Sequence, residues 1–181
     1  EGKCPDHNEV PQVLEEENYF FRLSRYGAEI KRKIESRELE ILPDTRRNEI
    51  LALLERGLDE VSFSRPADKV SLGIPVPGDP TQKIYVWCDA LANYVSALGF
   101  GGDEKPFKKF WPAQVHIIGK DILRFHAAIW PAMLLSTGLP LPHKIFVHGL
   151  ITLGGTKMSK TLGNVIDPLA LVKEYGTDAL R

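Results

Sequence analysis

The sequence predicts an α/β fold in which a parallel sheet is preceded by a mainly helical segment. From residue 83 to residue 147, short apolar runs alternate with helical stretches in a βαβαβ pattern. Such a pattern implies a parallel sheet with right-handed crossovers. Residues 66–82 are rich in proline and glycine, with the sharpest turn expected at Pro77-Gly78-Asp79-Pro80, so we expect an extended connection and a boundary there.

The segment before this connection contains two predicted helices. Residues 18–34 are expected to form one helix, because apolar side chains recur at helical spacing at Tyr19, Phe20, Leu23, Tyr26 and Ile30. The second helix is expected to begin at Pro43-Asp44-Thr45 and to end at Gly57, with its apolar side formed by Ile50, Leu51, Leu53 and Leu54.

The βαβαβ part is expected to run as strand 83–87, helix 89–98, strand 114–118, helix 121–137 and strand 144–147. Pro131 removes a backbone donor from the second of these helices and should kink it. A last short helix is predicted to begin after Asp167 as its N-cap, with Pro168 in its first position, and to end at Gly176.

Composition limits the possible classes of protein. The chain has 181 residues, 43% of them apolar, which is enough for one buried core. Its formal net charge of −1 provides no general basic field for a nucleic acid, so any RNA contact must be local. No apolar run reaches the length of a membrane span, and the two cysteines suit a reducing, cytoplasmic setting.

The N-terminal residues contain half of a possible zinc site. Cys4 and His7 have the C-x-x-H spacing of one ligand pair, but no second pair follows in the sequence. Two interpretations stay open: a surface cysteine and histidine without a metal, or a Zn²⁺ site whose other ligands lie upstream in a longer protein.

A glycine-bounded loop near the C-terminus carries two lysines, Lys157 and Lys160, and follows a strand-like run. Glycines let the backbone approach a ligand closely, and two ammonium groups can neutralise charge on a polyphosphate. A solvated basic turn is the alternative for any isolated K-x-x-K. A P-loop is excluded: Gly149 and Gly154 have the right separation, but Gly155 stands where that motif needs its lysine, and Lys157 is followed by Met158 instead of serine or threonine.

The three predicted strands end in polar or aromatic residues. Ligands of open α/β sheets bind at the carboxyl edge of the strands, so these endings should converge on one crevice with the lysine loop beside it. The endings are Trp87 with Asp89, Gly119-Lys120-Asp121, and His148-Gly149.

One face of the predicted helices combines apolar walls with polar aromatic groups. On the first helix the stripe is Trp87, Ala90, Leu91 and Tyr94, and on the second it is Ile122 and His126. An ordinary core is the simpler interpretation. However, tryptophan, tyrosine and histidine each bring a polar group that needs a partner when buried. Small walls, a tryptophan lid and a phenol held by an imidazole suit a flexible thioether side chain.

These motifs resemble the class I aminoacyl-tRNA synthetases. The lysine loop is similar to their KMSKS signature, with Thr161 in place of the last serine. Further stretches resemble bacterial methionyl-tRNA synthetases and extend the likeness over almost the whole chain: NYFFRLSRY at 18–26, RNEI at 47–50, SFSRP at 62–66, IYVWCDALANYVSALG at 84–99 and GKDILRFH at 119–126.

The resemblance implies a division of the chain. It implies that residues 1–17 are the end of a zinc-knuckle-like connective insertion and that residues 18–82 are a helical and extended connecting segment. Residues 83–165 would be the second half of a Rossmann-like catalytic fold with the KMSK loop, and residues 166–181 the helical start of the stem-contact region. The family's HIGH motif, its acidic group for the substrate ammonium and its anticodon-binding domain have no counterpart in the chain, so we expect a fragment.

The resemblance also implies roles for individual residues. Arg65 and Asp121 would form a structural ion pair, and Lys157 and Lys160 would be catalytic. The methionine pocket would contain Trp87, Ala90, Leu91, Tyr94, Ile122 and His126, with Tyr94 beside the sulfur and His126 holding its hydroxyl. The ATP site would contain His148, Gly149, Leu150, Ile151, Lys157, Met158, Ser159 and Lys160.

The implied function is that of a methionine–tRNA ligase acting on methionine, ATP with Mg²⁺, and tRNA(Met). Two alternatives stay open: a fragment of a valyl- or leucyl-type synthetase, and a non-catalytic binding module derived from a synthetase. The sequence leaves the oligomeric state open. It predicts no membrane partner.

Overall fold

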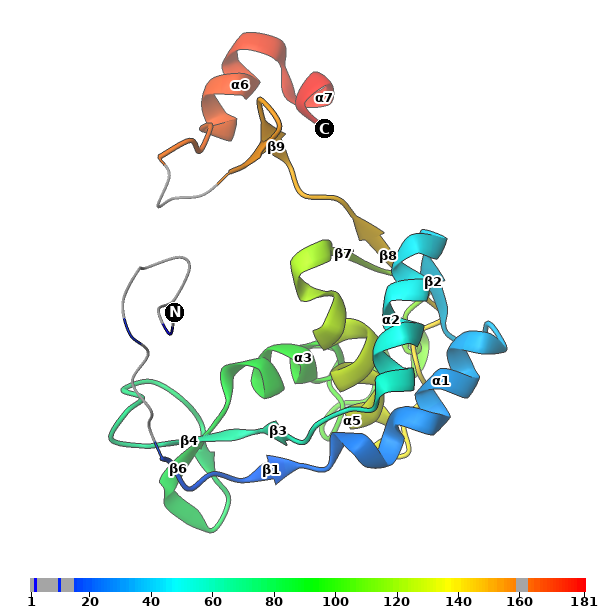
Figure 1. Cartoon of the computed structure of the whole chain (residues 1–181), viewed down its shortest axis with the longest axis vertical. Coiled ribbons are helices and arrows are strands. Elements are labelled where there is room, and N and C mark those ends of the chain that lie inside the picture. The colour runs from blue at the N-terminus through cyan, green and yellow to red at the C-terminus, as the bar shows by residue number, and fades with distance from the viewer. Residues whose placement is uncertain (1, 3–9, 11–14, 159–162) are drawn as a thin grey trace.

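The computed structural model describes residues 2, 10, 15–158 and 163–181. The body contains two three-stranded sheets and the longer helices, while the C-terminal segment from about residue 150 onward stands away from it (Figure 1). Cys4, His7, Ser159 and Lys160 lie outside the described residues.

A parallel sheet forms the centre of the fold, with the strand order β2-β8-β7. Its strands are β2 (Glu40–Leu42), β8 (Lys144–His148) and β7 (His116–Gly119). All pairings are parallel, and the register places Gly119 opposite His148. The α/β class with a parallel sheet is therefore confirmed, as are the strands predicted at 114–118 and 144–147.

The prediction that residues 83–87 form the first strand of the parallel sheet is wrong. The chain forms β6 (Asp79–Ile84) and becomes helical from Val86 onward. β6 lies in a separate antiparallel sheet between β4 (Ser64–Pro66) and β5 (Pro75–Val76). The turn at Pro77-Gly78, where Gly78 has φ 84°, joins β5 to β6 through two residues, and so short a connection requires antiparallel pairing.

β2 takes the third place in the parallel sheet instead. It lies within residues 18–82, which the sequence assigned to the connecting segment, and three residues gave too little periodicity to identify it. The pairing of β2 with β8 thus crosses the boundary expected at residue 82. The division into four segments stays a prediction.

The helix predicted over residues 18–34 is only half correct. Residues Phe20–Phe21 form β1, which pairs with β3 (Val61–Ser62), and a 3₁₀ turn at Leu23–Tyr26 leads into α1 (Gly27–Glu35). Strand pairing and the stacking of Phe21 on Phe63, with ring centroids 4.8 Å apart, outweigh the local helical pattern. The second predicted helix is confirmed as α2 (Asp44–Arg56), with Gly57 at its end.

α3, a short helix α4 and an irregular helical segment that ends in α5 follow the antiparallel sheet. α3 (Val86–Ser96) confirms the helix predicted at 89–98, whereas the short α4 (Lys105–Phe110) was not predicted. The helix predicted at 121–137 is divided into a 3₁₀ turn at Lys120–Ile122, a π-helical turn at Phe125–Ile129 and α5 (Trp130–Ser136). The π turn ends two residues before Pro131, which has no N–H for an α-helical bond, so the expected irregularity takes this form.

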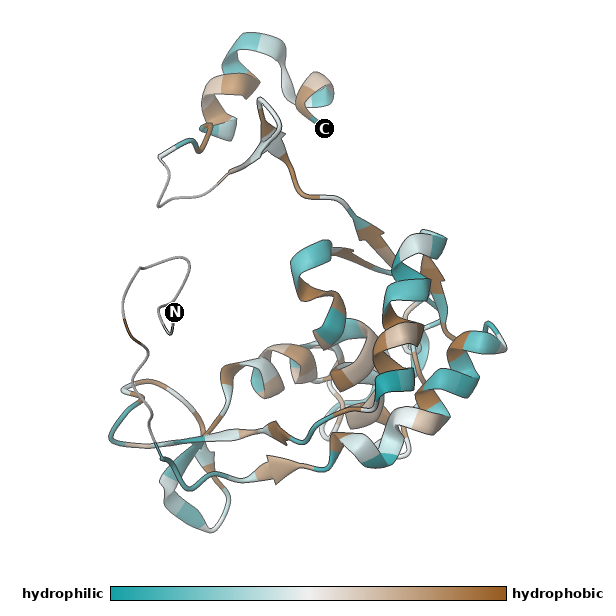
Figure 2. Ribbon diagram, in the orientation of Figure 1, coloured by the Kyte–Doolittle hydropathy of each residue, from teal (hydrophilic) through white to brown (hydrophobic). Residues whose placement is uncertain are grey.

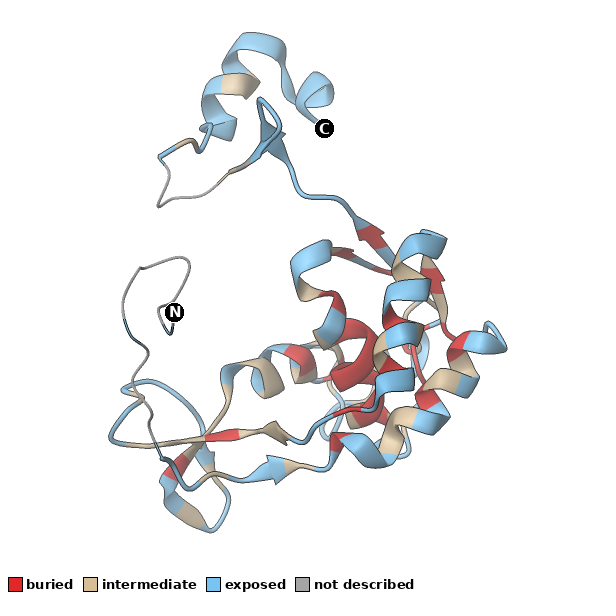
Figure 3. Cartoon of the chain, viewed as in Figure 1, coloured by how far each residue is buried: buried red, intermediate tan, exposed pale blue. Residues whose placement is uncertain are grey.

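The C-terminal segment contains a small hairpin and two helices. The hairpin pairs β9 (Thr152–Leu153) with β10 (Thr156–Lys157), and the helices are α6 (Pro168–Tyr175) and α7 (Thr177–Leu180). Asp167 caps α6 as predicted, because its carboxylate accepts a hydrogen bond of 2.9 Å from the N–H of Leu169. Figure 3 shows that most of this segment is exposed.

The hydrophobic core lies on one face of the parallel sheet. Ile41, Ile145, Val147 and Ile118 are buried there together with apolar side chains of α1, α2 and α5, and Figures 2 and 3 show apolar and buried residues gathered in this region. Residues that point to the opposite face are exposed: Ile117 by 69% and its register partner Phe146 by 44%. Among the described residues, every helix is too short or too polar to cross a lipid bilayer.

Candidate functional site

The carboxyl ends of β7 and β8 meet as the sequence predicted. Gly119 lies beside His148, and a Cβ atom at position 119 would be 2.8 Å from Oδ1 of Asp121 and 3.6 Å from Cε1 of His148. A side chain here would make ordinary contact with His148 and would require the exposed carboxylate of Asp121 to move, so glycine keeps the space between these two residues open. The third predicted ending, Trp87 with Asp89, comes from α3 and not from a strand of this sheet.

The predicted stripe on α3 faces the irregular helix that follows β7. Leu91 and His126 are buried, Trp87, Tyr94 and Ile122 are half-buried, and Ala90 is exposed. The Tyr94 hydroxyl and Nε2 of His126 are 2.9 Å apart. This is the hydrogen bond that the sequence predicted between the phenol and the imidazole.

The direction of this hydrogen bond follows from the other nitrogen of His126. Nδ1 lies 3.0 Å from the carbonyl oxygen of Ile122, which can only accept, so Nδ1 carries the proton. Nε2 then accepts, and the Tyr94 hydroxyl donates to it. Burial lowers the pKa of His126 and raises that of Tyr94, so both groups are held in the neutral forms that this bond needs.

Trp87 packs against an aromatic residue that the sequence analysis did not identify. Its ring lies on that of Phe125, with centroids 3.9 Å apart and planes 18° from parallel. Phe125 directly precedes His126, and the π turn positions both residues toward α3. Phe125 lies three residues after Ile122, so the helical spacing that marked Ile122 and His126 could have identified it.

A second histidine near Tyr94 was also missed. His116 begins β7 and is buried, and its ring centroid lies 4.3 Å from that of Tyr94. Trp130 donates from its indole Nε1 to Nε2 of His116 at 3.3 Å. Burial, and then the nearby His126, lower the pKa of His116 to about 4. A histidine at the start of an apolar strand run was the available signal.

The predicted ion pair between Arg65 and Asp121 is wrong for this chain. Within the described part of the chain these two side chains make no salt bridge. Arg65 belongs to β4, where it donates from Nη1 to the hydroxyl of Ser62 at 2.7 Å and lies over the ring of Tyr85 at 4.3 Å. The antiparallel sheet therefore holds Arg65, whereas Asp121 is exposed beside Gly119.

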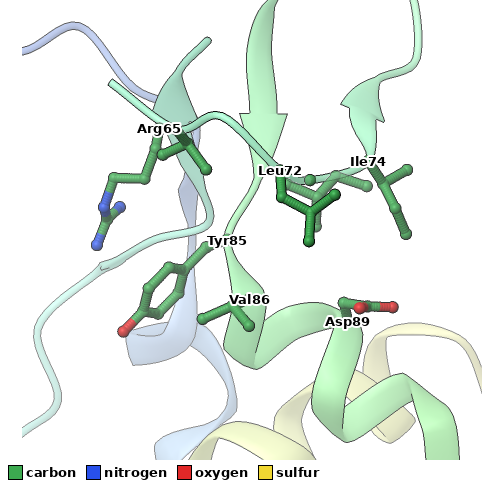
Figure 4. Close-up of a pocket in the computed structure, with 9 residues that line it drawn as sticks. Arg65, Leu72, Ile74, Tyr85, Val86 and Asp89 are labelled. Carbon is green, nitrogen blue, oxygen red and sulfur yellow. The ribbon is translucent and has the colours of Figure 1, made fainter. Parts of the chain in front are cut away.

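An open pocket of about 490 Å³ lies between the antiparallel sheet and the first turn of α3. Figure 4 shows the aliphatic side chains of Leu72, Ile74 and Val86 in this pocket, with Asp89 on one side and Arg65 with Tyr85 on the other. The stripe of Trp87 and Tyr94 occupies a different face of α3. The pocket was not predicted, because its walls come from short strands and turns.

The lysine loop begins in the β9–β10 hairpin. Gly154 and Gly155 form its turn with φ of 56° and 79°, values that disfavour residues with side chains. Lys157 of β10 pairs with Thr152 of β9, and Met158 is half-buried. The residues predicted to cradle adenosine, from His148 to Ile151, are exposed and connect β8 to this hairpin; His148 donates from Nδ1 to the carbonyl of Gly149 at 2.8 Å.

The family described as tRNA synthetases class I (M) matches residues 1–181. The chain belongs to this family. It is similar to the methionine–tRNA ligases of Thermotoga maritima, at 51% identity over 98% of the chain, and of Nostoc sp., at 49% identity over 99% of the chain. It spans 28% and 34% of the length of these two relatives, respectively.

Solved structures of the same family have the same fold. Mycobacterium tuberculosis methionyl-tRNA synthetase bound by methionyl-adenylate superposes with a TM-score of 0.87 at 42% identity, covering 98% of this chain and 35% of that one. The free state of the same synthetase gives a TM-score of 0.83 at 39% identity, with 98% and 34% covered. The resemblance to methionyl-tRNA synthetases is thereby confirmed.

Proposed function

We propose that this chain provides the methionine pocket and the phosphate-binding loop of a methionine–tRNA ligase. That enzyme would activate methionine with ATP to methionyl adenylate and transfer the methionyl group to tRNA(Met). The observation that carries the proposal is the hydrogen bond between Tyr94 and His126 on the predicted stripe. An ordinary apolar core needs no such pair, whereas a pocket for a thioether gains a defined polar wall from it.

The methionine side chain would lie along α3. Leu91 and Ile122 would provide aliphatic contact, Ala90 would leave room, and Trp87 on Phe125 would close the pocket. The hydroxyl oxygen of Tyr94 would lie beside the sulfur while its O–H donates to Nε2 of His126. The finer assignment of Ala90, Leu91 and Ile122 rests on the stripe and on family membership.

ATP would lie over the carboxyl ends of β7 and β8. Gly119 leaves space there, and His148, Gly149, Leu150 and Ile151 would form the exposed cradle for adenosine. The loop from Lys157 through Met158 and Ser159 to Lys160 would reach the phosphates. Its two ammonium groups would stabilise the negative charge that develops on the departing pyrophosphate.

In the proposed reaction, a carboxylate oxygen of methionine attacks the α-phosphorus of ATP, and the bond from that phosphorus to the bridging oxygen of pyrophosphate breaks. A ribose hydroxyl at the end of tRNA then attacks the carbonyl carbon, and AMP leaves. The contribution of this chain is to position substrates and stabilise charge, with no covalent protein intermediate.

Mg²⁺ would enter with the phosphates of ATP and neutralise part of their charge. Such a role fits the donors available, since the described residues contain no group of three His, Cys, Asp or Glu side chains arranged to hold a metal ion, and Mg²⁺ commonly binds through substrate phosphates. Zn²⁺ at Cys4 and His7, and a cytoplasmic location, stay predictions.

The test uses the full-length protein that carries this chain, called here the full-length ligase. We expect exchange of pyrophosphate into ATP that depends on methionine, with valine and leucine at least about 100-fold less effective in kcat/KM. Equal or better exchange with valine or leucine would favour the valyl- or leucyl-type alternative. Absence of exchange with all three amino acids would favour the non-catalytic binding module.

A further inference from the structure

His116 lies outside the predicted stripe, yet its side chain contacts the residue on which the stripe depends. It is the first residue of β7 and is only 6% exposed. Its ring packs on the ring of Tyr94 with centroids 4.3 Å apart and planes 39° apart. The described elements around it also bring Trp111 to 6.1 Å and His126 to 6.2 Å, measured between ring centroids.

Trp130 fixes the plane and the protonation form of the His116 ring. Indole Nε1 can only donate, so Nε2 of His116 accepts the 3.3 Å hydrogen bond between them and carries no proton. Trp130 is itself buried in α5. The imidazole is therefore anchored to the core before Tyr94 packs on it.

Tyr94 is held at two points as a result. His116 supports the face of its ring, and Nε2 of His126 accepts a hydrogen bond from its hydroxyl at 2.9 Å. His126 is in turn held by the carbonyl of Ile122 at 3.0 Å. A rotation of Tyr94 about its Cα–Cβ bond would break both contacts, so the two histidines together define where the hydroxyl oxygen lies.

We propose that His116 is a positioning residue for methionine, which holds Tyr94 at the pocket through the ring contact while Trp130 holds His116. This inference rests on the proposed function, because it concerns the same pocket. His116 touches no substrate itself. Without its support, Tyr94 would be held by the hydrogen bond to His126 alone and would leave this orientation more often, so recognition of the sulfur would weaken.

The test compares methionine with norleucine, which replaces sulfur by a methylene, in ATP–pyrophosphate exchange by the full-length ligase. His116→Phe keeps a flat ring but leaves the Trp130 N–H without its acceptor. His116→Gln keeps an acceptor and loses the ring. For both variants we expect the ratio of kcat/KM for methionine over norleucine to fall about three- to tenfold, with KM for methionine raised and KM for ATP unchanged.

The matched control is His143→Gln, which changes an exposed histidine directly before β8, at the same end of the sheet as His116, and should leave the ratio unchanged. Trp130→Phe removes the N–H that donates to His116. The double variant His116→Phe with Trp130→Phe should lower the methionine-to-norleucine ratio by less than the product of the fold-changes of the two single variants. Trp130→Phe also keeps the inference testable where His116→Phe does not fold.

A purely structural role for His116 predicts a different result. Thermal stability and total activity would then fall together, while the methionine-to-norleucine ratio of every folded variant would stay within about twofold of wild type. That outcome would overturn the inference and leave the proposed function intact. If the wild-type ligase shows no methionine-dependent exchange, it is the proposed function that fails.

Discussion

At the scale of single residues, Tyr94 and His126 were predictable because their spacing and chemistry are both visible in the sequence. Their hydrogen bond is confirmed. Phe125 and His116 were missed although the sequence carries a signal for each: Phe125 lies three residues after Ile122, and His116 begins an apolar strand run. The predicted ion pair of Arg65 with Asp121 is wrong for a different reason. Arg65 lies in β4 of the antiparallel sheet, whereas Asp121 lies in the turn that follows β7 of the parallel sheet.

Replacing Tyr94 with phenylalanine tests the polar wall of the pocket. The change removes the hydroxyl beside the proposed sulfur site and leaves Nε2 of His126 without its donor. One neutral hydrogen bond corresponds to roughly 0.5 to 1.5 kcal/mol, so we expect the methionine-to-norleucine ratio of kcat/KM to fall several-fold. His126→Ala should act in the same direction, and the double variant should show less than the sum of the two free-energy effects.

The measurement is pyrophosphate exchange by the full-length ligase, its two single variants and the double variant. Equal ratios in all four proteins would refute the thioether pocket. A core role alone would instead lower stability and leave the ratio unchanged.

His116 should also make folding stability depend on pH. Burial lowers its pKa from 6.5 to about 4, so the unfolded chain binds more protons than the folded chain between these pH values. The stabilisation is complete above pH 6.5 and is lost as the pH falls toward about 4. We expect the unfolding free energy of the chain in urea to drop between about pH 7.5 and about pH 5 by more in wild type than in His116→Gln. Identical drops would contradict a buried neutral His116.

At the scale of elements, the prediction succeeded where a helix or strand was long enough to show its period or was bounded by clear signals. α2, α3, α6 and β8 are examples. It failed where pairing between distant segments decides the structure: Phe20–Phe21 became β1 by pairing with β3, and β2 joined the sheet through β8. Neither partner can be identified from the local sequence.

The lysine loop gives a prediction at this scale. In the full-length ligase, Lys157→Ala and Lys160→Ala should each slow adenylate formation by about 10² to 10³ and leave methionine affinity nearly unchanged, because each removes charge stabilisation in the transition state. Single-turnover adenylate formation and equilibrium methionine binding measure the two quantities separately. An equal loss of methionine binding would show that the assignment of the loop to the phosphates of ATP is wrong.

At the scale of the whole molecule, the α/β class and the parallel sheet followed from the alternation of elements. Which strands join that sheet, and in what order, did not follow from it. Within the described residues, helices cover one face of the sheet only, and β7 pairs with β8 alone. The α6–α7 segment stands away from this body (Figure 1). A nucleotide lying over β7 and β8 would therefore be covered by this chain from one side.

From this one-sided cover we expect the isolated 181-residue chain to show no methionine-dependent exchange of pyrophosphate into ATP. A substrate bound on one side cannot be held in the aligned geometry that in-line attack needs. Purified chain, assayed beside the full-length ligase at equal concentration, provides the comparison. Robust exchange by the chain would disprove the expectation.

The uncovered side of β7 has a further consequence for handling the chain. Within the described residues β7 pairs with β8 alone, so its outer edge is open to another strand, and the exposed apolar side chains of Ile117 on β7 and Phe146 on β8 lie on the uncovered face beside that edge. Parallel sheets in folded proteins are normally covered on both faces. During purification the chain should therefore self-associate as its concentration rises, and Ile117→Lys, which places a charge on the uncovered face next to the open edge, should keep it monomeric in sedimentation experiments.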